Sequence, residues 1–103
     1  MTIIKKLNKM IEDELEGACE YAKCALKYKE DNNSLAKAFY ELSNEEMEHV
    51  SILHNEVVKL IEAYRKEHGN PPEAMQAVYD YLHEQQIERA NKIRMYQDQY
   101  KNY

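Results

Sequence analysis

Apolar residues recur at alternating steps of three and four positions through most of this chain, and few helix-breaking residues interrupt them. Such spacing places the apolar side chains along one side of an α-helix. The 103 residues include only two Gly and two Pro, whereas a sheet protein of this length needs more turns. The sequence therefore predicts an all-α protein.

The apolar pattern divides into three runs joined by two short polar connections. The first run predicts a helix over about residues 3–29, followed by a DNNS cluster at residues 31–34 whose side chains can cap the next helix. The second run predicts a helix over about residues 35–68, and the third predicts one over about residues 71–100. NPPE at residues 70–73 suits the start of that last helix. Because the connections are short, we expect an antiparallel hairpin and a third helix.

Length, charge and hydropathy exclude several classes of function. The chain has no linker or internal repeat, so we expect a single domain over residues 1–103. Its net charge of -5 and the lack of a basic cluster argue against a nucleic-acid partner. No apolar run approaches the ~20 residues that span a bilayer, so we expect no membrane partner and a cytoplasmic location. Cys19 and Cys24 fall on different faces of one helix, which favours free thiols.

Two polar residues occupy the apolar side of the second predicted helix. Glu46 and His49 form a Glu-x-x-His that is in phase with Leu42 and Leu53, so both side chains should point where leucines are otherwise expected. Ser43 and Glu46 also fit a Ser-x-x-Glu capping pattern, which would allow a helix break. The apolar spacing continues unshifted through this segment, so we favour one continuous helix.

A carboxylate also interrupts the apolar side of the first helix. Glu14 falls between Ile11 and Ala18 in the three-four rhythm. Antiparallel packing would bring Glu14, Glu46 and His49 to one level, near the middle of both helices. Two carboxylates and an imidazole suit iron or manganese. The alternative is a polar cluster that pairs with Lys or Arg or turns toward water, and the spacing alone does not decide between the two.

Other ionisable residues are expected to be solvent-exposed. Six acidic residues near the cluster lie off the apolar sides of their helices: Glu12, Asp13, Glu16, Glu20, Glu45 and Glu48. Glu84 and Glu88 also lie off the apolar side of the third helix, so we expect that helix to add no ligand. We interpret His54, His68 and His83 as surface residues, with an accessory or entry-site metal ligand as the alternative, and most tyrosines as packing residues.

The stretches DELEGACEY and ELSNEEMEHVSIL resemble the ferritin-like superfamily. They look most like the small encapsulated ferritins, and rubrerythrin domains are a more distant relation. The resemblance covers roughly residues 10–64 and aligns Glu14, Tyr21, Glu46 and His49 with recurrent residues of that family. It implies half a di-iron ferroxidase centre, in which Glu46 bridges the metals and Glu14 and His49 are terminal ligands. For Tyr21, hydrogen bonding to a ligand carboxylate or oxidation during iron chemistry competes with a packing role, which we favour.

The sequence also departs from complete ferritin subunits. Those carry a second Glu and a second Glu-x-x-His, and this chain has neither, so the other half must come from another chain. Two long helices with one apolar side cannot enclose a core alone, which independently predicts a homodimer or higher homo-oligomer. A ferritin-like four-helix bundle would then form by dimerisation. The polar tail QDQYKNY differs from the apolar extension that docks such proteins into a shell, which counts against an encapsulin-type partner.

The leading functional hypothesis is a di-iron carboxylate protein that binds Fe(II) and oxidises it with oxygen or peroxide. Manganese and zinc are further metals that these ligands accept. The competing hypothesis is a non-enzymatic helical assembly or structural protein, such as a phage or coat component, with a structural or inactive metal site. The sequence does not establish enzymatic activity, and metal dependence separates the two hypotheses.

Overall fold

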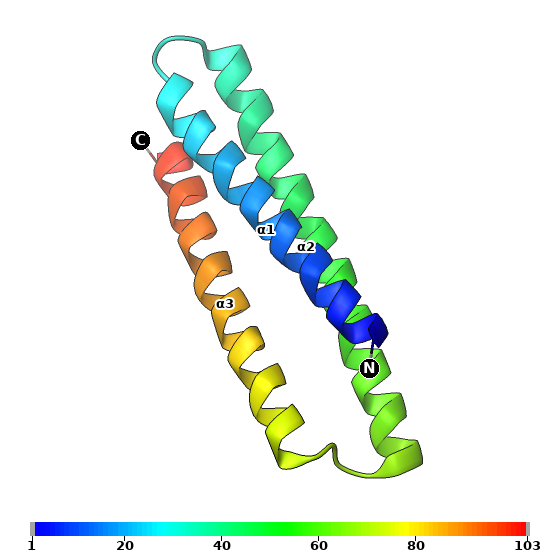
Figure 1. The fold of residues 1–103 in the computed structure, drawn as a ribbon. Helices are drawn as coiled ribbons and strands as arrows, with labels where there is room; N and C mark the ends of the chain where they lie inside the picture. Colours follow the sequence, from blue (N-terminus) through cyan, green and yellow to red (C-terminus); the bar gives the residue numbers. More distant parts are fainter. Residues whose placement is uncertain (1, 103) are drawn as a thin grey trace.

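The computed structural model describes residues 2–102, which form three long α-helices. Helix α1 spans Thr2–Tyr28, α2 spans Asn33–His68 and α3 spans Glu73–Asn102. The helices form a rod of 55 × 18 × 18 Å. Figure 1 shows that α1 and α2 form an antiparallel hairpin and that α3 returns alongside α1. The predicted all-α hairpin with a third helix is confirmed, and each helix ends within two residues of its predicted end.

Capping interactions explain where α2 begins and ends. The Asn32 side chain accepts a hydrogen bond from the backbone N–H of Leu35 at 3.1 Å and so caps the first turn. Gly69 ends the helix with φ of 76°, a conformation that L side chains rarely adopt, and its N–H donates to the Arg65 carbonyl. Helix α2 continues unbroken past Ser43 and Glu46, which confirms the single long helix.

The hydrophobic core lies mainly on α1. Its buried members come from all three helices: Ile4, Ile11, Leu15, Ala18, Ala22, Val57 and Ile93. Helix α1 packs extensively on α2 and also on α3, whereas α2 and α3 touch each other sparsely. Alanines on α1 let the neighbouring helices approach closely. Helix α1 is therefore the central element of the chain.

Hydrogen bonds explain the polar residues on the buried side of α3. Gln97 Nε2 donates to Ser43 Oγ at 2.8 Å, and the same hydroxyl donates to the Ala18 carbonyl at 2.7 Å. Nearer the other end of the rod, Gln86 Nε2 donates to Asn8 Oδ1 at 3.1 Å. No buried side-chain nitrogen or oxygen in residues 2–102 lacks a hydrogen-bond partner. The polar residues thus fix the position of α3 without leaving unsatisfied groups.

The structure corrects the predicted apolar sides of α1 and α2. Leu15, at 1% exposure, fills the core position that the sequence pattern gave to Glu14. On α2, Leu35 and Leu42 are each 38% exposed, although the pattern placed both on the buried side. They remain exposed because this side of α2 faces away from α3 and residues 2–102 cover it only in part.

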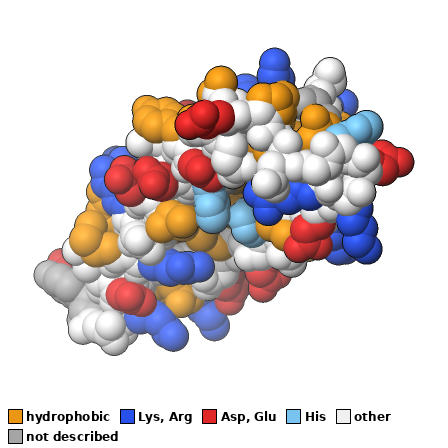
Figure 2. All heavy atoms as spheres, turned by 90° about the horizontal axis from the view of Figure 1, so that it is seen from below, with side chains coloured by type: hydrophobic (Ala, Val, Ile, Leu, Met, Phe, Trp, Pro, Cys, Tyr) orange, Lys and Arg blue, Asp and Glu red, His pale blue; other side chains and the backbone are white. Residues whose placement is uncertain are grey.

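The free cysteines agree with the sequence-based expectation. No helix within residues 2–102 is long and apolar enough to cross a membrane. Cys19 and Cys24 are free and partly buried. Viewed from the end that carries the α2–α3 connection, acidic, basic and hydrophobic side chains are interspersed (Figure 2). That face therefore offers no continuous basic surface.

Candidate metal centre

Helices α1 and α2 bring two carboxylates and an imidazole together. One donor atom from each of Glu14, Glu46 and His49 lies within 4.8 Å of the other two. His49 Nδ1 is 3.3 Å from Glu14 Oε2 and 3.8 Å from Glu46 Oε1. The predicted meeting of these side chains at one level of the hairpin is confirmed.

The local helix geometry explains this arrangement. Glu46 and His49 are three residues apart, so they project from the same side of α2 one turn from each other. Across the hairpin, the hydrogen bond from Ser43 to the Ala18 carbonyl fixes the register of α2 on α1. Because both residues of this bond lie within about one turn of the cluster, the register places Glu14 opposite the Glu-x-x-His.

The cluster is only partly shielded from solvent. The side chains of Glu14 and Glu46 are 29% and 25% exposed, and that of His49 is 51% exposed. Residues that follow the same helical spacing surround it on one side of the hairpin, which we call the open face. The open face comprises Ile3, Leu7, Met10, Glu14, Gly17 and Tyr21 on α1, and Leu35, Phe39, Leu42, Glu46, His49 and Leu53 on α2. The three polar ligands thus lie in the middle of a largely apolar, uncovered face.

Gly17 gives the Glu46 carboxylate room to lie against α1. A Cβ atom at this position would come within 3.3 Å of Glu46 Oε2, which is a tight contact. A glycine inside a helix destabilises it by about 0.5–1 kcal/mol relative to alanine. Its position beside the cluster therefore favours a role in making room for the Glu46 carboxylate. The sequence-based reasoning missed Gly17, and the available signal was a helical glycine three residues after Glu14.

The surroundings of Glu46 raise the pKa of its carboxyl group. Hydrogen bonding to Glu14 raises this pKa above its ordinary value of 4.5, and burial and the charge of Glu14 act in the same direction. Proximity to His49 opposes these effects, and Glu45 adds to them. The metal-free cluster therefore holds a proton on Glu46 up to a higher pH than water does. Because a metal needs the carboxylate form, metal binding and protonation of Glu46 compete.

The raised pKa predicts a pH dependence of stability for the metal-free protein. Between pH 4.5 and the native pKa of Glu46, the folded state binds more protons than the unfolded state, so the free energy of unfolding falls as pH rises through this window. We expect Glu46→Gln to remove this contribution, which makes the variant progressively more stable than the wild type as pH rises. Urea unfolding from about pH 4 to about pH 8, at one protein concentration, measures the difference.

Glu48→Gln is the matched control because it removes the same group from an exposed position of α2. If Glu46→Gln and Glu48→Gln change stability identically at every pH, the proposed interaction between the Glu14 and Glu46 carboxyls is wrong.

The other candidate residues lie outside the cluster of donor atoms. The Tyr21 ring stacks against Phe39, with ring centroids 6.2 Å apart, and no hydrogen bond joins Tyr21 to Glu14 or Glu46 within the described residues. Most of the neighbouring acidic residues are exposed, as predicted, and Glu12 is half-buried. Glu84 and Glu88 are exposed on α3, and no α3 residue belongs to the cluster. His68 is exposed, and His54 and His83 pair with each other across α2 and α3.

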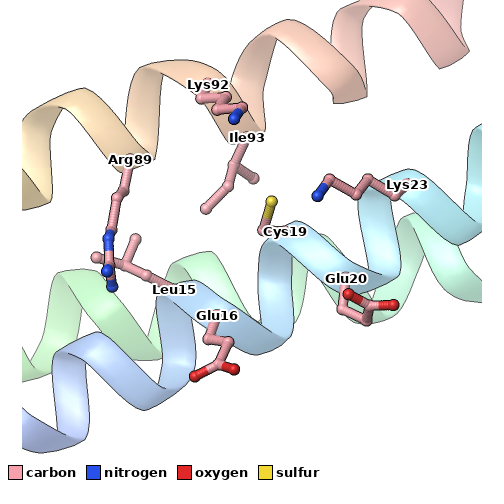
Figure 3. A pocket seen from close by; sticks show the side chains of 8 residues that line it. All are labelled: Leu15, Glu16, Cys19, Glu20, Lys23, Arg89, Lys92 and Ile93. Atoms are coloured by element: carbon pink, nitrogen blue, oxygen red, sulfur yellow. The ribbon is translucent and has the colours of Figure 1, made fainter.

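A separate cleft of about 480 Å³ lies between α1 and α3. Figure 3 shows the Cys19 thiol and Ile93 pointing into it from opposite sides, whereas Glu16 and Glu20 point away from α3. None of the three clustered ligands lines this cleft. We therefore locate the candidate site by its converging donor atoms, on a different side of α1.

The donor set fits a hard or borderline divalent metal. Ligand atoms about 2.1 Å from a shared ion are at most about 4.2 Å apart, so donors within 4.8 Å of each other need only a small closure. Three ligands leave open positions on such an ion, which water or a second chain can fill. Comparisons with protein-family models, curated proteins and solved structures find no match to this chain.

Proposed function

We propose that two copies of this chain pack through their open faces and form a di-iron carboxylate site that binds Fe(II) and oxidises it with oxygen or peroxide. The observation that carries this proposal is the position of Glu14, Glu46 and His49. Their donor atoms converge at the centre of an apolar face that the chain leaves uncovered. An incomplete ligand set at an uncovered face is expected if a second subunit supplies both the remaining ligands and the cover.

The ligand count supports two chains per site. Di-iron carboxylate bundles take a Glu from each of two helices and a Glu-x-x-His from each of two others. One copy of this chain offers Glu14 and the Glu46/His49 pair, so two copies supply the complete set. The resemblance to the ferritin-like superfamily around these residues supports the same assignment. In this arrangement Glu46 from each chain bridges the metals, and Glu14 and His49 are terminal ligands.

The packing of the single chain also supports dimerisation. Met10, Leu35 and Leu42 on the open face are between 38% and 43% exposed, and a partner hairpin would remove them from water. Helix α3 packs mainly on α1, on a side of the hairpin away from the open face. Two hairpins can therefore meet as a four-helix bundle without displacing α3.

The proposed reaction is simple in its balance. Each of two Fe(II) substrate ions loses one electron and becomes Fe(III), and the two electrons, with two protons from solvent, would reduce peroxide to water or oxygen to hydrogen peroxide. The carboxylates neutralise the charge of the bound iron, and His49 contributes a nitrogen ligand. Tyr21 belongs to the open face, so a partner helix would enclose it close to the iron. The free thiols fit a reducing cytoplasm, where Fe(II) is the available form of iron.

Native mass spectrometry before and after anaerobic Fe(II) addition tests this function. We expect assemblies with an even number of chains and two iron ions for every two chains, followed by Fe(II) oxidation when oxygen or peroxide is admitted. Iron bound to isolated single chains would contradict the shared site. Assembly with no iron uptake would instead favour the non-enzymatic helical module, and binding of Zn(II) or Mn(II) without Fe(II) oxidation would favour an inert or differently metallated site.

A further inference from the structure

A second pair of metal-binding side chains lies between α2 and α3. The imidazole rings of His54 and His83 stack with their centroids 5.0 Å apart and their planes 15° apart. Neither ring takes part in any of the hydrogen bonds or ion pairs found within residues 2–102. The backbones of these helices approach each other at few points, and the histidine pair is one of several side-chain contacts that join them, together with the Gln97–Ser43 hydrogen bond.

The surroundings favour the neutral form of His54. Burial lowers the pKa of His54 below its ordinary value of 6.5, and the positive charge of His83 acts in the same direction. Near neutral pH His54 is therefore mostly unprotonated, which is the form that binds metals. The charged side chains in the adjoining grooves are Asp80 on one side and Arg94 on the other. Asp80 accepts a hydrogen bond from Gln76 at 2.9 Å, and no ion pair joins it to either imidazole within residues 2–102.

We propose that His54 and His83 form a second metal site, which binds a divalent first-row transition metal that favours imidazole, with Zn²⁺ as its representative. Two imidazoles from neighbouring helices provide the nitrogen ligands that suit zinc, copper and nickel better than the hard cations. The stacked rings need a rotation about their side-chain torsions to direct one nitrogen each at a shared ion. Water, or the free lone pairs of Asp80, can fill the remaining positions.

The second site is independent of the carboxylate cluster. His54 follows His49 by five residues, so it projects from a different side of α2. That side faces α3, whereas the cluster lies on the open face. Dimerisation through the open face would therefore leave His54 and His83 accessible. Figure 2 shows that histidine side chains reach the surface in the view from the α2–α3 connection. A metal here would link α3 to α2 at their sparse contact and stabilise the position of α3.

Zinc titration of a variant that lacks the first site tests this inference. In the Glu46→Ala/His49→Ala background, we expect one equivalent of Zn²⁺ to bind per chain, and the ring nitrogens of His54 and His83 to shift in ¹H–¹⁵N NMR spectra. Loss of a group that only supports a ligand weakens metal binding by about 10–100-fold. Adding His54→Ala or His83→Ala should therefore weaken zinc binding by at least about tenfold.

His68→Ala in the same background is the matched control. His68 lies at the exposed end of α2 against the Tyr64 ring, and its removal should leave zinc affinity unchanged. His83 is exposed, so its substitution keeps the test valid if the half-buried His54 proves necessary for folding. Equal zinc affinity with and without His83, or no shift of the two pairs of ring nitrogens, would overturn the proposal. Neither result would bear on iron binding by the carboxylate cluster.

Discussion

Glu46→Ala is expected to abolish Fe(II) oxidation while leaving the helices and their assembly intact. In the proposed centre the Glu46 carboxylate of each chain would bridge the two iron ions. The substitution would therefore remove both bridging ligands. Loss of groups that merely support a ligand already weakens metal sites by about 10–100-fold, so we expect the oxidation rate to fall by more than about 100-fold. Stopped-flow absorbance after mixing Fe(II)-loaded protein with oxygen measures this rate.

Glu48→Ala provides the comparison for this experiment. It removes an equal charge from an exposed position two residues further along α2 and should oxidise iron at the wild-type rate. Circular dichroism and sedimentation velocity should show the same helix content and assembly for both variants. A Glu46→Ala protein that oxidises iron as fast as the wild type would exclude Glu46 as a bridging ligand. If a variant oxidised iron slowly only because it is unfolded, its circular dichroism spectrum would show a loss of helix content.

Leu42→Glu is expected to separate the two chains and to remove oxidation without changing any proposed ligand. Leu42 is 38% exposed on the open face, about one turn from Glu46 and thus close to the proposed two-fold axis. Two introduced carboxylates would approach each other across that axis, and such like-charge contacts cost several kcal/mol. We therefore expect dimer affinity to fall by about 100-fold or more. Sedimentation equilibrium at several protein concentrations measures it.

Ile52→Glu is the matched control for the interface. Ile52 is 62% exposed and lies on α2 outside the open face, so the same added charge should leave both assembly and oxidation unchanged. Wild-type oxidation by monomeric Leu42→Glu protein would show that one chain suffices. Glu46→Ala should lose iron oxidation and keep the dimer, whereas Leu42→Glu should lose both. The two variants therefore distinguish the role of the ligands from the role of the interface.

The sequence predicted the helices and the meeting of the three ligands, and it failed on which residues face the core. The spacing of apolar residues and the capping residues are local features of the sequence. The predicted helix ends therefore lie close to the observed ones. On α1, however, apolar residues form two adjacent stripes, one through Ile11 and Leu15 and another through Met10 and Tyr21. The first forms the buried core, whereas on the second Met10 is 43% exposed and Tyr21 is half-buried against Phe39. When apolar residues cover about half of the circumference of a helix, their spacing cannot show which stripe packs against the same chain.

The placement of α3 could not be predicted for a different reason. Its buried side includes Gln86 and Gln97, and their partners Asn8 and Ser43 lie far away in the sequence. Such pairs have no periodic signature, since each depends on two side chains that meet only after the helices pack. The same holds for the stacked rings of His54 and His83, because no spacing in the sequence indicates that these two residues meet.

The Ser43 hydroxyl has a consequence for how an active assembly would form. It joins all three helices of one chain at a single buried point, close to the ligands. The folded monomer thus presents its carboxylates already ordered, and encounter with a second copy would be rigid docking rather than coupled folding. In the proposed assembly, the conformational entropy of the ligand side chains would be lost when each chain folds, before iron binds. Iron would then bind to ligands that are already positioned and would not have to order them.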